Sequence, residues 1–575
     1  MVRAAIDSTA NEMFLVTVRT AKSPIIYETY DFSTGITNAK AETVGISLLI
    51  PLWAGVHRFI AKSMVLDFMS AGEPMLPGDI VICNDPYTTG THMNDIGLAM
   101  PIFDADKIIA IATAKGHCSD IGGMNPGSFG PGSTEIFQEG TFIPPVKYYH
   151  EGKLNEEVLK ILVGNSRIPD YMRGDLEALA ASLRLAEKRM KGLIAKYGSE
   201  TVRVTMEETI RDGERMARAR LAELPMGEFY AEDFLDEGFT SKEPLKVSVK
   251  VKITKDEFLA DFTGNPEAPR VSVNTTLPAT FAAVGTIFLA ITNPRAQFNQ
   301  GLMAPIRLVC PENTIFNAKR PRPVSVYWET MTYAEDLVWK ALAPSIPDKM
   351  SAGHFLSICS EIIAGTDPRN GEYFVLVEPN PGGWGAANNA DGESALMNIA
   401  DGETYANPVE VLEIRYPVIV EKHKLNTEAG SGPGRFRGGV GMIKDYKVLA
   451  DDAVFTTAVN RSKIPPWGVA GGQTGVVNSM VLLRDGKELM RVSRILGFKL
   501  DRGDVLSIRS GGGGGWGDPF ERDTELVLGD VHNRMITEET AEKMYAVAVD
   551  TNQWVVDQAA TARLRANQSG HSVKS

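Results

Sequence analysis

GDIVICNDPYTTGTHMNDIGLAMPIFDADKIIAIATAKGHCSDIGG, residues 78–123, carries the strongest signal for the architecture of this chain. Short apolar runs at 80–82 and 108–114 are separated by Gly, Pro, Asn and Asp, a pattern typical of buried strands that lead into structured loops. Two hexapeptides share the pattern His-x-x-Asp-Ile-Gly, one beginning at His92 and one at His117, and each follows a predicted strand. A strand, a turn and a second strand fit between the two histidines, so we expect both loops to open at the same end of one sheet.

The paired histidines are suited to holding a metal ion. A neutral imidazole supplies a nitrogen ligand, and an acid three residues later, Asp95 or Asp120, either binds the ion or orients the imidazole and moves a proton. Asp31 is the expected third ligand, because a carboxylate between Tyr30 and Phe32 is costly to bury unless it is paired or bound to metal. Such a set leaves coordination positions open for water or substrate. The alternative is that histidines in Gly-, Asn- and Asp-rich loops are hydrogen-bonded structural residues, and the residues alone leave both interpretations open.

A covalent mechanism through Cys118 is a weaker hypothesis. Cys118 adjoins His117, but neighbouring residues of an extended segment point to opposite faces, which hinders activation of the thiol by that imidazole. The sequence contains no Gly-x-Ser-x-Gly motif. The four cysteines form no Cys-x-x-Cys pair, so a disulfide framework or zinc ribbon is not expected.

The rest of the chain predicts an α+β protein, a multi-layer mixed fold with substantial antiparallel β structure and interspersed helices. An apolar stripe predicts a helix over 175–197, with Asp175 as its N-cap and Gly198 as its stop, followed by a second helix over 200–224. Strict alternation predicts a strand at 245–253, and similar alternation on both sides of an Asp485-Gly486 turn predicts a hairpin at 479–492. The expected regions are an N-terminal metal-site region at 1–175, a helical hairpin at 176–240, a β-rich core at 241–520 and a C-terminal helical tail at 521–575.

Composition and charge exclude several classes of function. The formal net charge is −13, and an acidic surface repels phosphate backbones and anionic lipids, so nucleic acid and membrane partners are not expected. The longest apolar runs are shorter than a membrane span, and residues 1–20 lack the pattern of a secretory signal, so a cytoplasmic location is expected.

Glycine-rich segments at 382–385, 430–441 and 511–517 raise the question of a nucleotide site. No Gly-x-x-x-x-Gly-Lys-Ser/Thr motif occurs, and none of these segments shows the strand and helix context of a dinucleotide site. We therefore interpret them as tight turns and places of close backbone approach, and we expect no ATP-binding loop in this chain.

The chain resembles the hydantoinase B/oxoprolinase family, which also contains subunits of acetone and acetophenone carboxylases. The matching motifs span nearly the whole chain. They are GDIVICNDPY (78–87), GTHMND (90–95), DIGGMNPGS (120–128), EIFQEG (135–140), IPPVK (143–147), NPVEVLE (407–413), GPGRFRGG (432–439), PPWG (465–468) and the segment 512–519.

This resemblance implies a heteromeric enzyme. It implies a hydantoinase A-like ATPase subunit as partner, with small accessory subunits as a further possibility, and ATP and Mg bound mainly by that partner. It also implies one divalent metal ion, Zn or Mn, in this chain, with the family's ligands falling on Asp31, His92 and His117 and with Asp95 and Asp120 as neighbouring carboxylates.

Two departures from the family pattern bear on the substrate. Tyr30 stands where family hydantoinases and oxoprolinases have Arg, and Cys118 stands where they have a second His. A less charged site suits a ketone, so the resemblance favours a biotin-independent ketone carboxylase similar to acetophenone carboxylase, which joins a small ketone and bicarbonate to give a β-keto acid. The alternatives are an ATP-dependent hydantoinase, 5-oxoprolinase or lactamase that hydrolyses a cyclic amide, and a non-enzymatic subunit that only assembles a partner.

Overall fold

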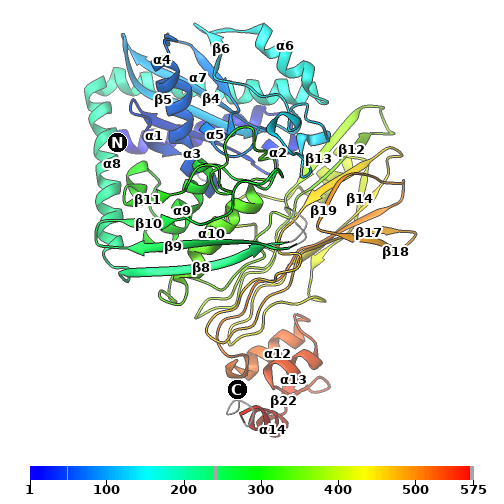
Figure 1. The fold of residues 1–575 in the computed structure, drawn as a ribbon. Helices are drawn as coiled ribbons and strands as arrows, with labels where there is room; N and C mark the ends of the chain where they lie inside the picture. The colour runs from blue at the N-terminus through cyan, green and yellow to red at the C-terminus, as the bar shows by residue number, and fades with distance from the viewer. Residues whose placement is uncertain (48–49, 237–242, 570–575) are drawn as a thin grey trace.

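Helices and largely antiparallel sheets alternate in layers through the molecule (Figure 1), which confirms the predicted α+β class. The computed structural model describes residues 1–47, 50–236 and 243–569. Within these residues no helix is long and apolar enough to cross a membrane.

The N-terminal layer is a seven-stranded sheet with the order β2-β1-β5-β4-β3-β6-β7, in which all neighbouring strands are antiparallel. Its long hairpin, β4 and β5, contains the predicted strand at 108–114, and β3 contains the one at 80–82. The strands are β1 Phe32–Asn38, β2 Thr43–Ile46, β3 Ile80–Cys83, β4 Asp95–Asp104, β5 Lys107–His117, β6 Val146–His150 and β7 Lys153–Leu154.

Helices cover both faces of this sheet. The long helix α7 packs on β4 and β5, and α1 packs along α7, while α3 lies against β1 and β5. Alternate residues of β5 therefore meet different helices: Gly116 faces Leu179 of α7, whereas Thr113 bonds to His57 of α3. The helices of this part are α1 Val2–Thr20, α2 Pro24–Tyr27, α3 Pro51–Ala61, α4 Phe68–Ser70, α5 Pro86–Thr89, α6 Glu156–Asn165, α7 Pro169–Tyr197 and α8 Ser199–Leu221.

The predicted helical hairpin is α7 and α8, but α7 begins earlier than expected. Pro169 occupies the first turn of α7, a position that its fixed φ suits. Asp175 is therefore not the N-cap, and the prediction was wrong: the residue lies inside the helix, where its buried carboxylate accepts hydrogen bonds from the backbone of residues 22 and 23. Gly198, at φ 82°, ends α7 as predicted.

A second sheet, in the order β11-β10-β9-β8, packs against two further helices. The predicted strand at 245–253 is β9, which pairs antiparallel with β10 and β8. The apolar helix α9 is sandwiched between α3 and α10, and α10 also contacts β8 and β9. These elements are β8 Gly227–Leu235, β9 Leu245–Ile253, β10 Phe258–Asp261, β11 Ile306–Val309, α9 Leu277–Thr292 and α10 Trp328–Leu342.

Two antiparallel sheets pack together around a separate apolar core. Their orders are β13-β12-β16-β19 and β14-β15-β20-β17-β18, and the shared core includes Leu376 and Phe455 from the first sheet and Leu482 and Ile508 from the second. The predicted hairpin at 479–492 is β17 and β18, which confirms that expectation. The elements are β12 Glu361–Thr366, β13 Tyr373–Glu378, α11 Val409–Arg415, β14 Val418–Leu425, β15 Met442–Val448, β16 Val454–Ala458, β17 Ser479–Arg484, β18 Lys487–Val492, β19 Arg494–Lys499 and β20 Val505–Arg509.

The glycine-rich segments run side by side next to this core, without side chains between their backbones. A methyl group on Gly513 would overlap the Trp384 carbonyl oxygen, and one on Gly438 would overlap the Gly513 carbonyl oxygen. These glycines therefore serve close backbone approach, as the sequence indicated.

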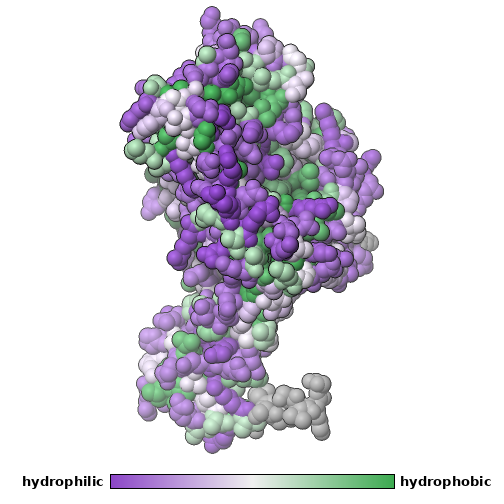
Figure 2. Space-filling model, turned by 90° about the vertical axis from the view of Figure 1, so that its left-hand side faces the viewer, coloured by the Kyte–Doolittle hydropathy of each residue, from purple (hydrophilic) through white to green (hydrophobic). Residues whose placement is uncertain are grey.

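The last described residues form a small unit below the body of the molecule, joined to it by a narrow waist (Figures 1 and 2). It has its own apolar core, which includes Val527, Ala541 and Tyr545. Residues 570–575 lie outside the described part. The elements of this unit are α12 Thr524–His532, α13 Glu538–Tyr545, β21 Val549–Asp550, β22 Val555–Val556 and α14 Gln558–Ser569.

Candidate metal centre

The β4–β5 hairpin brings the two twin motifs to one end of the seven-stranded sheet. His117 is the last residue of β5, and Asp95 is the first residue of β4 and its direct cross-strand partner. Cross-strand partners point their side chains to the same face of a sheet, so these two side chains meet. His92 precedes β4 by three residues, and the short helix α5 separates it from β3.

A buried lysine shapes the loop that presents His92. Lys115 lies on the same face of β5 as His117, and its Nζ donates to the carbonyl oxygens of Thr89 (3.1 Å) and Gly90 (2.7 Å). Gly90 and Thr91 both have positive φ, 85° and 66°, which is uncommon for a β-branched residue such as Thr. The ammonium group thus holds the carbonyls of a strained turn directly before His92.

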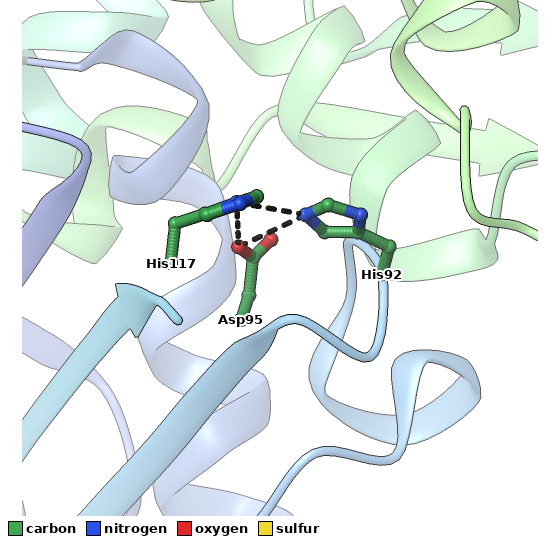
Figure 3. Close-up of side chains that lie close together, drawn as sticks. All are labelled: His92, Asp95 and His117. Carbon is green, nitrogen blue, oxygen red and sulfur yellow. Dashed lines mark hydrogen bonds and ion pairs between the residues drawn. The ribbon is translucent and has the colours of Figure 1, made fainter. Parts of the chain in front are cut away.

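Two imidazoles and one carboxylate converge at this place (Figure 3). His92 Nε2 lies 3.1 Å from Asp95 Oδ1 and 3.1 Å from His117 Nδ1, and His117 Nδ1 lies 3.3 Å from Asp95 Oδ1. All three residues are buried. An ion with tetrahedral bonds of about 2.0–2.2 Å separates its ligand atoms by about 3.3–3.6 Å, so the spacing of this triad is close to that of a bound cation.

The hydrogen bond of His92 also favours a metal ligand. Its Nδ1 faces the Ser325 carbonyl oxygen at 3.1 Å, and a carbonyl can only accept, so Nδ1 carries the proton. In the neutral ring Nε2 then presents a lone pair to Asp95 and His117. A backbone carbonyl that fixes the tautomer of a histidine in this way is typical of metal-ligating histidines.

Asp31 lies at the edge of the triad. Its Oδ2 is 3.6 Å from His117 Nδ1, and its side chain is 28% exposed, toward the cavity. Burial raises the pKa of Asp31 to about 7, the charge of His117 opposes this shift, and the acids Asp95 and Asp401 add to it. Burial also acts to raise the pKa of Asp95, but the charges and hydrogen bonds of His92 and His117 outweigh it and hold that pKa below its ordinary value.

The triad lies in the wall of a cavity. The His92 ring lies against Tyr327 and Trp328, with ring centroids 5.3 Å apart in both cases. Asp401 contributes a third carboxylate to the wall, and burial followed by the charge of Asp95 raises its pKa to about 7. The other lining residues are Ile25, Asp31, Leu52, Trp53, Gly127, Phe129, Ile358, Ser360, Ile362, Val377, Pro379 and Thr404.

Asp120, the acid of the second twin motif, is not brought into this cluster. Its carboxylate pairs with Arg167 (2.9 Å) and accepts the backbone N–H groups of Gly122 and Gly127. Because Gly127 lines the cavity, Asp120 shapes the wall of the site rather than facing its interior.

Cys118 is a core residue in this structure. It is 2% exposed, packs in the main apolar core, and burial raises the pKa of its thiol well above the ordinary value. A buried thiol that is held neutral does not act as a nucleophile, so the arrangement disfavours covalent catalysis by Cys118.

Several residues of the site carry no signal in the sequence. Ser325, Tyr327 and Trp328 come from the start of α10 and the segment before it, and Asp401 comes from the segment after β13. The sequence around these residues shows no repeated or periodic pattern, and more than two hundred residues separate them from the twin motifs. Only tertiary packing brings them to the histidines.

Known proteins resemble this chain in sequence and in fold. The family model for hydantoinase B/oxoprolinase matches residues 1–519. An uncharacterized protein of Methanocaldococcus jannaschii is 32% identical, and the alignment covers 98% of each chain. The beta subunit of caprolactamase from Pseudomonas jessenii is 29% identical over 98% of each chain, and the crystal structure of that ATP-dependent caprolactamase superposes with a TM-score of 0.91 at 28% identity over 98% of each chain.

A structure of acetone carboxylase without nucleotide superposes with a TM-score of 0.92, over 100% of this chain and 83% of that one. Its identity is 20%, so this likeness concerns the fold alone. Both solved structures are described as ATP-dependent enzymes. The caprolactamase sequence is that of a beta subunit, so that enzyme has more than one kind of subunit. The chain belongs to the hydantoinase B/oxoprolinase family.

Proposed function

We propose that this chain is the metal-bearing subunit of an ATP-dependent enzyme that hydrolyses a cyclic amide. The observation that carries the proposal is the convergence of His92, Asp95 and His117, with 3.1–3.3 Å between their ligand atoms, at the wall of a largely apolar and aromatic cavity. The caprolactamase beta subunit, which aligns over 98% of both chains, supports a ring amide as substrate.

In this proposal His92, Asp95 and His117 hold one divalent ion, Zn or Mn, and no biotin takes part. The ion would polarise the carbonyl oxygen of the substrate and stabilise negative charge that develops on it. Asp31 faces the same cavity beside His117, so its carboxylate is placed to accept the proton of the attacking water molecule. Asp95 thereby takes the place of third ligand that the sequence suggested for Asp31.

ATP would be used by a partner. The sequence contains no phosphate-binding loop of the P-loop type, and the caprolactamase relative is one subunit of an assembly. We therefore assign ATP and Mg to a hydantoinase A-like ATPase subunit, with small accessory subunits as further components. The overall reaction balances as one cyclic amide, two water molecules and one ATP giving one amino acid, one ADP and one phosphate, because ring opening and ATP hydrolysis each consume a water molecule.

Ketone carboxylation is the second candidate, and Tyr30 is the observation that favours it. Tyr30 packs between Phe14 and Tyr405 directly before Asp31 in the chain, so this position carries no guanidinium to bind a polar imide or carboxylate. In this reading a ketone, bicarbonate and ATP would give a β-keto acid.

The experiment uses this chain co-purified with its ATPase partner and supplied with ATP. Formation of 6-aminohexanoate from caprolactam, independent of bicarbonate, is the expected result. Bicarbonate-dependent consumption of acetone or acetophenone, without ring opening of any lactam, would replace the first proposal by the second. A His92→Ala/His117→Ala variant that assembles with the partner yet retains metal and turns over normally would refute the assignment of the site under either chemistry.

A further inference from the structure

The charged side chains that line the cavity beside the triad are acidic. Asp31, Asp95 and Asp401 all line it, and among the described residues that form its wall none is Lys or Arg. A divalent ion would offset two of these three carboxylates. The remaining wall is largely apolar and aromatic, formed by Leu52, Trp53, Phe129, Tyr327, Trp328 and Ile362.

Asp401 reaches the cavity from a different part of the molecule than the triad. It lies in a segment that is fixed to the N-terminal part on both sides, because Leu52 N donates to the Ala400 carbonyl and Tyr405 N donates to the Thr29 carbonyl. Within the described ranges, no hydrogen bond or ion pair engages the Asp401 carboxylate. Its acceptor atoms are therefore free for a ligand in the cavity.

Two basic side chains in the loops around the site, Lys115 and Arg167, are hydrogen-bonded to groups outside the cavity. Lys115 directs its ammonium group to Thr89 and Gly90, and Arg167 directs its guanidinium to Asp120 and the Gly123 carbonyl. Neither can turn to neutralise a negative substrate without losing buried hydrogen bonds.

We infer that this site selects a neutral, largely apolar cyclic amide and rejects the same ring bearing a carboxylate, with Asp401 as the residue that sets this charge preference. The inference rests on the proposed function and names its substrate class. The ring would pack on the aromatic wall, and its amide N–H would donate to the Asp401 carboxylate. A ring whose carboxylate lies within about 5 Å of Asp401, in surroundings of effective dielectric near 20, would bind roughly 100-fold or more weakly than the neutral ring, because the two negative charges repel each other.

The test compares 2-pyrrolidone with 5-oxoproline, which is the same ring with one added carboxylate. For the complex with its ATPase partner, assayed near pH 8.5 where the Asp401 carboxylate is ionised, kcat/KM should favour 2-pyrrolidone by about 100-fold or more. Asp401→Asn should narrow this ratio by about tenfold or more, chiefly by lowering KM for 5-oxoproline, and Asp401→Lys should narrow it further. Asp451→Asn, at a 73% exposed acid remote from the cavity wall, is the matched control and should leave the ratio unchanged.

Equilibrium binding of the two rings to the same complex without ATP separates this inference from the proposed function. Turnover of neither these two rings nor caprolactam, with binding of 2-pyrrolidone retained and 5-oxoproline excluded, would remove the hydrolase proposal and keep the charge preference. Equal or better binding or kcat/KM for 5-oxoproline in the wild type would overturn the inference. So would an unchanged ratio in a folded Asp401→Asn variant, or failure of both rings to bind.

Discussion

At the scale of single residues, Asp95 and Asp31 face the same cavity in different surroundings. Asp95 has two imidazole nitrogens within 3.3 Å, whereas Asp31 has one at 3.6 Å. A carboxylate that two cationic or metal-bound imidazoles stabilise stays ionised, as a metal ligand must. Asp31, with its pKa raised to about 7, is better suited to exchange a proton near neutral pH.

This division of roles predicts unequal losses of metal affinity. Asp95→Asn should weaken Zn²⁺ binding to the full chain by more than about 100-fold, beyond the 10–100-fold typical of outer-shell changes, and Asp31→Asn should weaken it by less. Competition titration with a chelator measures both constants, with thermal melting as the control for folding. A larger loss in Asp31→Asn would return the role of third ligand to Asp31.

Lys115 is predicted to position His92. Lys115→Met removes the hydrogen bonds to Thr89 and Gly90 that precede His92, so metal affinity should fall by about 10–100-fold. Lys444→Met is the matched control, because it removes a buried lysine paired with Glu378 at 2.6 Å in the other core. The control should lower the melting temperature and leave metal affinity unchanged. Equal weakening in both variants would show a general loss of folding instead.

At the scale of elements, a buried carboxylate inside the long helix α7 helps to hold the N-terminal segment against it. Asp175 accepts hydrogen bonds from Lys22 N (2.8 Å), Ser23 N (3.1 Å) and Ser23 Oγ (2.5 Å), all at a buried position. Asp175 lies inside the helix and does not cap its N-terminus. Its hydrogen bonds instead form a tertiary contact with residues 22 and 23. The contact fixes the segment that leads into Asp31.

Removal of this carboxylate is predicted to destabilise the N-terminal part. Asp175→Ala leaves the Lys22 and Ser23 donors unsatisfied and should cost about 2–4 kcal/mol. Glu177→Ala, two residues along the same helix and exposed, should change stability by less than about 0.5 kcal/mol. Thermal unfolding of both variants is the measurement, and equal shifts would contradict the role given to Asp175.

A second link between elements should appear in the pH dependence of stability. Glu139 accepts the N–H groups of Val324 and Ser325, and Ser325 in turn accepts the His92 Nδ1 proton. Burial raises the pKa of Glu139 from 4.5 to about 8, against the pull of these two N–H groups. A folded pKa above the unfolded value contributes stability that is present below about pH 4.5 and lost as the pH rises through about 8.

Wild-type protein should therefore lose stability relative to Glu139→Gln as the pH rises from 5 to 8, because the glutamine does not titrate. The melting temperatures of the two proteins at several pH values in this range give the difference. Glu151→Gln, at an exposed acid, should follow the wild-type trend. A difference between wild type and Glu139→Gln that is constant over the range would contradict the burial of a protonated Glu139.

The sequence predicted the part of the site whose residues lie close together along the chain. Twin motifs separated by one hairpin specify that His92, Asp95 and His117 lie near one sheet end, because strand pairing is set over a short stretch. The sequence did not predict Ser325, Tyr327 or Asp401, since the packing of α10 and of the segment around Asp401 depends on contacts between distant residues. The N-cap at Asp175 failed for a related reason: a buried acid and a capping acid look alike without tertiary contacts.

At the scale of the whole molecule, the cavity lies between the N-terminal part and the sheet of β12 and β13, and its apolar wall belongs to the main core. Its wall includes Trp53 from the N-terminal part and Ile362 and Val377 from the sheet of β12 and β13. The fold is thus required for the site, because neither part encloses the cavity alone. The small C-terminal unit has a separate core and lies almost entirely beyond residue 519, the end of the family match.

The central claim is that one divalent cation is bound by His92, Asp95 and His117. Anomalous diffraction from crystals of the purified full chain, recorded on both sides of the Zn and Mn absorption edges, tests it directly. We predict a single anomalous peak about 2.0–2.2 Å from His92 Nε2, His117 Nδ1 and an Asp95 carboxylate oxygen. Well-ordered side chains at these three residues with no anomalous peak between them, in protein supplied with either metal, would contradict it.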